Sequence, residues 1–124
     1  MIIYDASSFF ERLQRKDLDL ESFILDITIY EIGNVAIKHA TILKDISGDD
    51  AKSLLKIVAN WKNVLYLDQA EAGDVYDIAQ KSGLTFYDAA YAYLAGKYGA
   101  SLETCDKKLH RQAQKFCKVK LLEV

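Results

Sequence analysis

Short apolar runs alternate with longer amphipathic segments along the whole chain. In the longer segments apolar residues recur at helical spacing, as Ala51, Leu54, Leu55 and Val58 do, and this periodicity predicts amphipathic helices. Helices are predicted over residues 7–16, 28 to the low forties, 51–58, 75 to about 83, 86 to about 99, and from 106 onward. The short apolar runs predict five strands, at residues 2–4, 23–25, 64–67, 102–104 and 119–122.

This alternation of strands and helices is typical of βα units, which build a mainly parallel sheet. The strands are short, uninterrupted apolar runs, which fits strands covered by helices on both faces. A length of 124 residues is that of one domain. The sequence therefore predicts an α/β fold, a three-layer α/β/α sandwich in a single domain over residues 1–124. In such a sheet, functional side chains gather at the carboxyl ends of the strands.

Composition and charge narrow the function. Apolar residues make up 51% of the chain and charged residues 27%, which is typical of a globular protein and not of a disordered one. A net charge of −2 argues against binding nucleic acid by bulk charge. The longest uncharged run, residues 89–96, is too short to cross a membrane, and the first residues do not resemble a signal peptide. We therefore expect a cytoplasmic protein without a membrane partner.

Four acidic residues fall where functional side chains are expected. Asp5 directly follows the first strand and Asp106 the fourth, while Glu31 and Asp88 lie in the first turns of two helices. The helix from Asp88 runs about 15 Å, at 1.5 Å per residue. The chain then returns about 16 Å to Asp106, at 3.3 Å per residue. These matched lengths place Asp88 and Asp106 at about the same height. The same argument places Glu31 beside Asp5 if the second strand is parallel to the first, so that all four carboxylates converge on one edge of the sheet.

Carboxylates that converge repel one another unless they are protonated, paired with cations or bound to a metal. Oxygen ligands without histidine or cysteine favour Mg²⁺ or Mn²⁺ over zinc. Single acids at these places have a simpler explanation. Thr28-x-x-Glu31 and Thr85-x-x-Asp88 are similar to helix-capping boxes, and acids that follow strands are common turn residues.

Four short motifs carry a resemblance to a known family. They are Asp5-Ala6-Ser7, Tyr30-Glu31-Ile32-Gly33-Asn34, the segment from Leu84 to Ala95 around Asp88, and Leu102-Glu103-Thr104-Cys105-Asp106-Lys107-Lys108-Leu109. In order and spacing they resemble the motifs of PIN domains over essentially the whole chain. The third and fourth motifs together are the most specific.

The resemblance implies an endoribonuclease that depends on Mg²⁺ or Mn²⁺, with one or two ions in its site. It implies that Asp5, Glu31, Asp88 and Asp106 form the catalytic and metal-binding quartet, supported by Ser7, Asn34 and Thr104. It further implies a five-stranded parallel sheet of order 3-2-1-4-5. Small PIN domains are most often toxins of the VapC kind, so a VapB-type antitoxin and a homodimer are expected as well.

The remaining features leave alternatives open. Glu103 falls inside a predicted central strand, where an unpaired charge is costly; it needs a partner or solvent, or the strand boundary is misplaced.

Lys108, Arg111 and Lys115 are spaced to share one helical face, which fits either RNA phosphates or a solvated surface. The four tyrosines around the third motif fit the core or a partner surface (Tyr87, Tyr91, Tyr93, Tyr98). Cys105 and Cys117 are expected to pack as small apolar residues, and their pairing is undecided.

Other functions are compatible with the same residues. A PIN fold can bind RNA or protein without cleaving it, and a PIN nuclease can process RNA without being a toxin. A phosphoacceptor receiver domain is a third possibility, but such domains use paired acids after the first strand, where this chain has Asp5 alone. Metal-dependent cleavage that requires Asp5 would separate a nuclease from a binding module.

Overall fold

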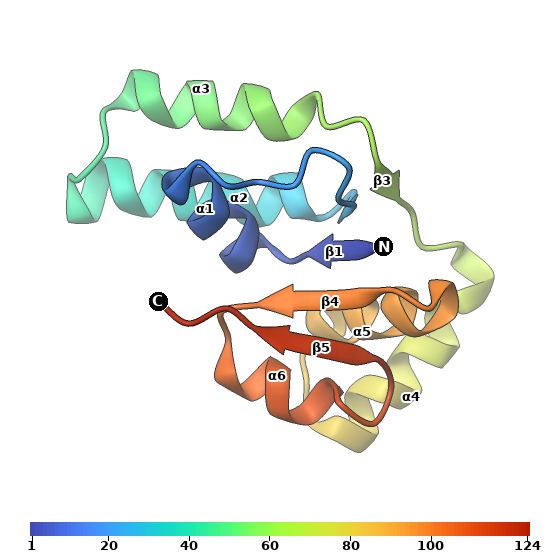
Figure 1. The fold of residues 1–124 in the computed structure, drawn as a ribbon. Coiled ribbons are helices and arrows are strands. Elements are labelled where there is room, and N and C mark those ends of the chain that lie inside the picture. The colour runs from blue at the N-terminus through green and yellow to red at the C-terminus, as the bar shows by residue number, and fades with distance from the viewer.

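The computed structural model describes residues 1–124 and alternates strands with helices (Figure 1). The elements are β1 (Ile2–Tyr4), α1 (Ala6–Arg15), β2 (Ile24–Leu25), α2 (Thr28–Ile37), the π-helix η1 (Lys38–Leu43), α3 (Gly48–Ala59), β3 (Val64–Leu65), the 3-10 turn η2 (Gln69–Glu71), α4 (Ala72–Ser82), α5 (Phe86–Tyr98), β4 (Ser101–Thr104), α6 (Lys107–Ala113) and β5 (Lys118–Leu121). Every strand and helix predicted from the sequence is present. Gly83 and Gly99 end α4 and α5 with φ of 73° and 62°, a left-handed conformation that glycine adopts without strain.

The strands form two parallel ladders instead of the single five-stranded sheet of order 3-2-1-4-5. One ladder has the order β1-β4-β5 and the other pairs β2 with β3. A single parallel bridge, Ile3 to Phe23, is the only pairing between them. The prediction of one continuous five-stranded sheet is therefore wrong. The next backbone N–H of β2, that of Leu25, donates to the Thr28 hydroxyl at 3.0 Å and not to β1.

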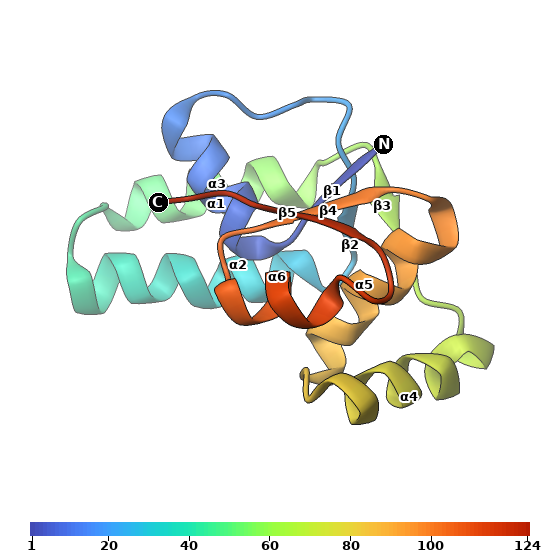
Figure 2. The same ribbon diagram turned by 60° about the horizontal axis from the view of Figure 1, so that its bottom comes forward.

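Two apolar cores lie on opposite faces of the strands, and this confirms the layered arrangement. Neighbouring strand residues point to opposite faces, so Ile3 joins the core made with α4, α5 and α6, while Tyr4 joins the core made with α1, α2 and α3. Figures 1 and 2 show the same division, with α1 and α3 on one side of β1, β4 and β5 and α5 and α6 on the other. The strands are therefore covered on both faces.

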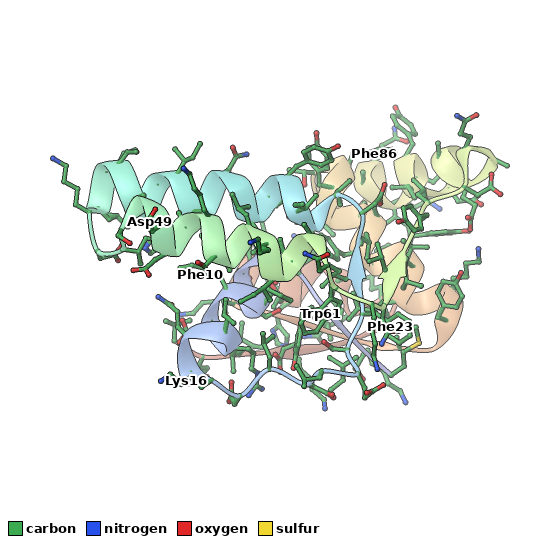
Figure 3. The ribbon with its side chains drawn as sticks, turned by 90° about the horizontal axis from the view of Figure 1, so that it is seen from above. Phe10, Lys16, Phe23, Asp49, Trp61 and Phe86 are labelled. Atoms are coloured by element: carbon green, nitrogen blue, oxygen red, sulfur yellow. The ribbon has the colours of Figure 1, made fainter.

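Aromatic side chains fill the core beneath α2 and α3. Figure 3 shows these two helices side by side, with Phe10 of α1 and Trp61 at the end of α3 on the side that faces α1. The rings of Phe9 and Trp61 meet edge to face with centroids 5.1 Å apart, an arrangement that aromatic pairs favour. Ile32 and Ala36 of α2 are buried in the same core as Phe9 and Phe10, and this packing places the first turn of α2.

Glu103 does lie within β4 and is buried, and it has a partner. Arg12 of α1 donates to both of its carboxylate oxygens, from Nε at 3.0 Å and from Nη2 at 2.8 Å. The predicted strand boundary is therefore correct, since a paired and hydrogen-bonded charge is tolerated where an unpaired one is not. Cys105 and Cys117 are both free thiols. None of the helices has the length and hydropathy needed to span a membrane.

Candidate active site

Asp5 is the buried centre of the candidate site. It directly follows β1 and is the N-cap of α1, where its Oδ1 accepts the backbone N–H of Ser8 at 2.9 Å. Oδ1 also accepts the Ser7 hydroxyl at 2.7 Å, and Oδ2 accepts the Thr104 hydroxyl at 2.5 Å. Three donors thus hold a carboxylate that is only 6% exposed.

The strand register explains why Thr104 reaches Asp5. Tyr4 of β1 pairs with Glu103 of β4, so the next residue of each strand lies side by side at the carboxyl edge of the sheet. The Thr104 oxygen also accepts the backbone N–H of Asp106 at 3.0 Å, and the Ser7 oxygen accepts that of Cys105 at 3.0 Å. The two hydroxyls therefore tie the turn after β4 to Asp5.

Glu31 reaches the site from the first turn of α2. Its Oε1 accepts the Tyr91 hydroxyl at 2.7 Å. The capping-box explanation fails for this residue, because the N-cap of α2 is Ile27 and no side chain caps the helix. Thr28 instead uses its hydroxyl to accept the Leu25 N–H.

Asp88 and Asp106 complete the quartet from α5 and α6. Thr85 caps α5 by accepting the backbone N–H of Asp88 at 3.1 Å, and the Thr85 side chain also lowers the pKa of the Asp88 carboxyl. Asp106 is exposed and is the N-cap of α6, where Oδ1 accepts the N–H groups of Lys108 and Leu109. The simpler explanation, a turn residue after a strand, thus accounts for one oxygen of Asp106.

The four carboxylates line one open pocket of about 330 Å³. Its lining consists of Asp5, Ala6, Ser7, Glu31, Asn34, Val35, Asp88 and Asp106, and is called the acidic pocket below. Asn34 lies one helical turn from Glu31 and is exposed, and its side chain makes no hydrogen bond in the structure. No three Asp, Glu, His or Cys side chains are drawn together closely enough to hold a metal ion as they stand, so the acids line the walls of the pocket instead of meeting at one point.

The acids influence one another electrostatically. Burial, together with the charges of Asp5 and Asp88, raises the pKa of Glu31 to about 7, although the Tyr91 hydrogen bond lowers it. Burial and the charges of Asp5 and Asp106 raise the pKa of Asp88 to about 6. Burial raises the pKa of Asp5 as well, while its hydroxyl and N–H donors lower it. The pocket therefore concentrates negative charge that the chain itself does not neutralise.

The donor chemistry of this pocket fits a divalent cation. All four acids offer hard oxygen atoms, which Mg²⁺ and Mn²⁺ prefer, and neither histidine nor cysteine lines the pocket. Each acid also lies at the N-cap or in the first turn of a helix, where the positive end of the helix dipole lowers the cost of gathering negative charge.

The basic residues expected to bind RNA are exposed but do not share one helix. Lys108 and Arg111 belong to α6, whereas Lys115 lies beyond its end at Ala113. The prediction of one common helical face is therefore wrong for Lys115, because the chain turns away toward β5. Lys108 is close enough to the pocket for its charge to lower the pKa of Asp88.

Sequence reasoning left Tyr91 between the core and a partner surface and assigned it no role in the site. The residue is fully buried, yet its hydroxyl lies 2.6 Å from the Thr28 hydroxyl and donates to Glu31. Its spacing from Asp88 was a usable signal, since residues three apart share a helix face.

Comparisons with known proteins find relatives of this chain. A family model described as PIN domain matches residues 3–115. The chain is 37% identical to "Exonuclease VapC9" of Pyrobaculum aerophilum over 69% of its own length and 62% of the relative's length. It is also 37% identical to "Ribonuclease VapC3" of the same organism, over 77% of this chain and 72% of that one.

Solved structures share the fold. The crystal structure of PAE2754 from Pyrobaculum aerophilum superposes with a TM-score of 0.79 at 33% identity, over 95% of this chain and 82% of that one. FitAcB from Neisseria gonorrhoeae has a TM-score of 0.64 at 19% identity, over 96% of each chain. FitAB bound to a DNA fragment has a TM-score of 0.66 at 19% identity, over 97% of this chain and 94% of that one.

Proposed function

We propose that this chain, which belongs to the PIN-domain family, is a ribonuclease that hydrolyses RNA phosphodiester bonds with Mg²⁺ or Mn²⁺. The observation that carries the proposal is the acidic pocket, in which four carboxylates from four different segments face one space. The ribonuclease and exonuclease names of the two relatives support the class of reaction.

In this proposal Asp5, Glu31, Asp88 and Asp106 hold the divalent ion. The ion, when bound, supplies Lewis-acid chemistry: it makes water more acidic and offsets the negative charge of the phosphate. Ser7 and Thr104 orient Asp5 and favour its ionised form against the effect of burial, because both hydroxyls donate to its carboxylate. No protein nucleophile is required: water adds to the phosphorus while the bond to the 3′ oxygen breaks, which leaves a 5′-phosphate and a 3′-hydroxyl.

The pocket also explains how an acidic site accepts an anionic substrate. Without a cation, four carboxylates repel a phosphate, so RNA and the divalent ion are expected to bind together. Lys108 and Arg111, exposed on α6 after Asp106, and Lys115 beyond the helix are proposed to contact flanking phosphates, which positions RNA without reading its sequence.

Cleavage of a linear and a circular RNA by the purified protein tests this function. We expect cleavage with Mn²⁺ or Mg²⁺ and none with EDTA. A circular substrate has no ends, so its cleavage would identify an endonuclease, as we propose. Asp5→Asn and Asp106→Asn should each lose activity by at least about 100-fold, a typical cost for removing transition-state charge stabilisation.

The matched control is Asp77→Asn, which removes an exposed carboxylate of α4 outside the pocket; it should cleave like the wild type. Cleavage that persists in EDTA, or that survives both pocket substitutions, would refute the proposal. RNA binding without cleavage by protein that binds Mn²⁺ would identify a non-catalytic binding module instead.

We further propose that the nuclease is a VapC-type toxin that acts as a homodimer and is neutralised by a VapB-type antitoxin. The VapC names of the two relatives support the toxin class and its antitoxin, whereas the homodimer rests on the family resemblance alone. Expression of the chain alone should arrest cell growth, and expression of Asp5→Asn should not. Normal growth despite cleavage in vitro would favour an RNA-processing nuclease, and light scattering would report the number of copies.

A further inference from the structure

A chain of buried hydrogen bonds leads from the backbone of β2 to Glu31. Leu25 N–H donates to Thr28 Oγ1 at 3.0 Å, Thr28 Oγ1 lies 2.6 Å from the Tyr91 hydroxyl, and that hydroxyl donates to Glu31 Oε1 at 2.7 Å. Thr28 and Tyr91 are both 0% exposed. Of the residues in this series of hydrogen bonds, only Glu31 lines the acidic pocket.

The number of available protons fixes which group donates at each step of this series of hydrogen bonds. A hydroxyl has one proton to donate, and Tyr91 donates its proton to Glu31. The proton between Thr28 and Tyr91 must therefore come from Thr28, whose oxygen in turn accepts the Leu25 N–H. Every donor points toward Glu31, so the arrangement stabilises an oriented carboxylate.

The same chain interrupts the sheet. The Leu25 N–H is the group that would have continued the pairing of β2 with β1, and it is given to Thr28 instead. β2 thus has one hydrogen bond fewer to β1, and the Leu25 N–H instead begins the series of hydrogen bonds that holds Glu31. A glutamate has several rotatable bonds, and Tyr91 provides the one hydrogen bond to this carboxylate, leaving Oε2 free to face the pocket.

We propose that Tyr91 is a positioning residue that, together with Thr28, holds Glu31 for cation binding. This inference rests on the proposed function, because it assigns Tyr91 a task in the same pocket. Partners that orient a metal ligand typically change metal affinity by about 10–100-fold when they are removed. Tyr91 therefore acts through Glu31 and has no contact with RNA in this proposal.

Calorimetric titration of the purified protein with Mn²⁺, without RNA, tests the role of Tyr91. Tyr91→Phe keeps the buried ring and removes only the hydroxyl, and it should weaken Mn²⁺ binding about 10-fold. The matched control is Tyr93→Phe in the same helix. The Tyr93 hydroxyl also donates to a glutamate, Glu71 Oε2 at 2.6 Å, outside the pocket, and its loss should change Mn²⁺ affinity less than 2-fold by this reasoning.

A double-mutant cycle separates positioning from core packing. If Tyr91 acts through Glu31, Tyr91→Phe should cause no further loss of affinity in a Glu31→Gln background. Thr28→Ser, which keeps the hydroxyl, should bind Mn²⁺ as the wild type does. An effect of Tyr91→Phe that is equally large in both backgrounds, or equal to that of Tyr93→Phe, would overturn the inference and leave the proposed function standing. A wild type that binds no Mn²⁺ would refute both.

Discussion

Replacing Glu31 by glutamine should stabilise the metal-free protein at alkaline pH. The pKa of Glu31 is raised from 4.5 to about 7 by burial and by the charges of Asp5 and Asp88. Below pH 4.5 Glu31 is protonated in both the folded and the unfolded chain, so its ionisation does not lower the free energy of unfolding. Between pH 4.5 and 7 only the unfolded chain releases the proton, and stability falls as the pH rises. Above pH 7 Glu31 is ionised in both states, and the full loss in the free energy of unfolding is present.

The size of this cost follows from the shift in pKa. A change from 4.5 to about 7 corresponds to about 3 kcal/mol between the two protonation states. Glu31 is only partly buried, and solvent screening reduces the figure to roughly 1.5 kcal/mol. Glutamine has the same shape, can still accept the Tyr91 hydrogen bond and carries no charge, so it should recover most of this free energy at pH 8.

Urea unfolding in EDTA at pH 4.5 and pH 8 measures the effect. We expect Glu31→Gln to raise the free energy of unfolding by about 1.5 kcal/mol at pH 8 and to change it little at pH 4.5. Asp77→Asn, outside the pocket, serves as the control at both pH values. Adding Mn²⁺ at pH 8 should reverse the order, because the cation binds the wild type more tightly. Equal effects of Glu31→Gln at the two pH values would refute the reasoning that the charges in the pocket oppose folding.

Three other predictions follow from the packing and the surface charge. Arg12→Ala should destabilise the fold by about 3 kcal/mol in urea unfolding, because it leaves the buried Glu103 carboxylate unpaired; a loss below about 0.5 kcal/mol would contradict this. Gly96→Ala should also destabilise, by about 1–3 kcal/mol in thermal unfolding, since a Cβ there would lie 2.5 Å from a backbone oxygen in the turn after α6. Charge reversal at Arg111 and Lys115 should weaken RNA binding and flatten its dependence on salt; an unchanged salt slope would show that neither residue contacts phosphate.

The sequence alone determined the elements and the four acids that line the acidic pocket. Strands and helices are read from local periodicity, and the glycines that end α4 and α5 are local signals as well. The four acids could be placed at one edge because parallel strands end together and the helix from Asp88 is as long as the return to Asp106. The PIN-domain motifs supplied the family, which the comparisons confirm.

The tertiary structure decided which side chains pair across the molecule. Arg12 and Glu103 are 91 positions apart, and Tyr91 and Glu31 are 60 apart. Periodicity reports which face of an element is buried, but such pairs depend on the strand register and on the angles at which helices pack. The interruption between β1 and β2 has the same origin, since a hydroxyl of α2 competes for a backbone N–H of β2. The sequence specifies the chemical type of each side chain, whereas the orientation and the pKa of that side chain are set only when distant segments pack together.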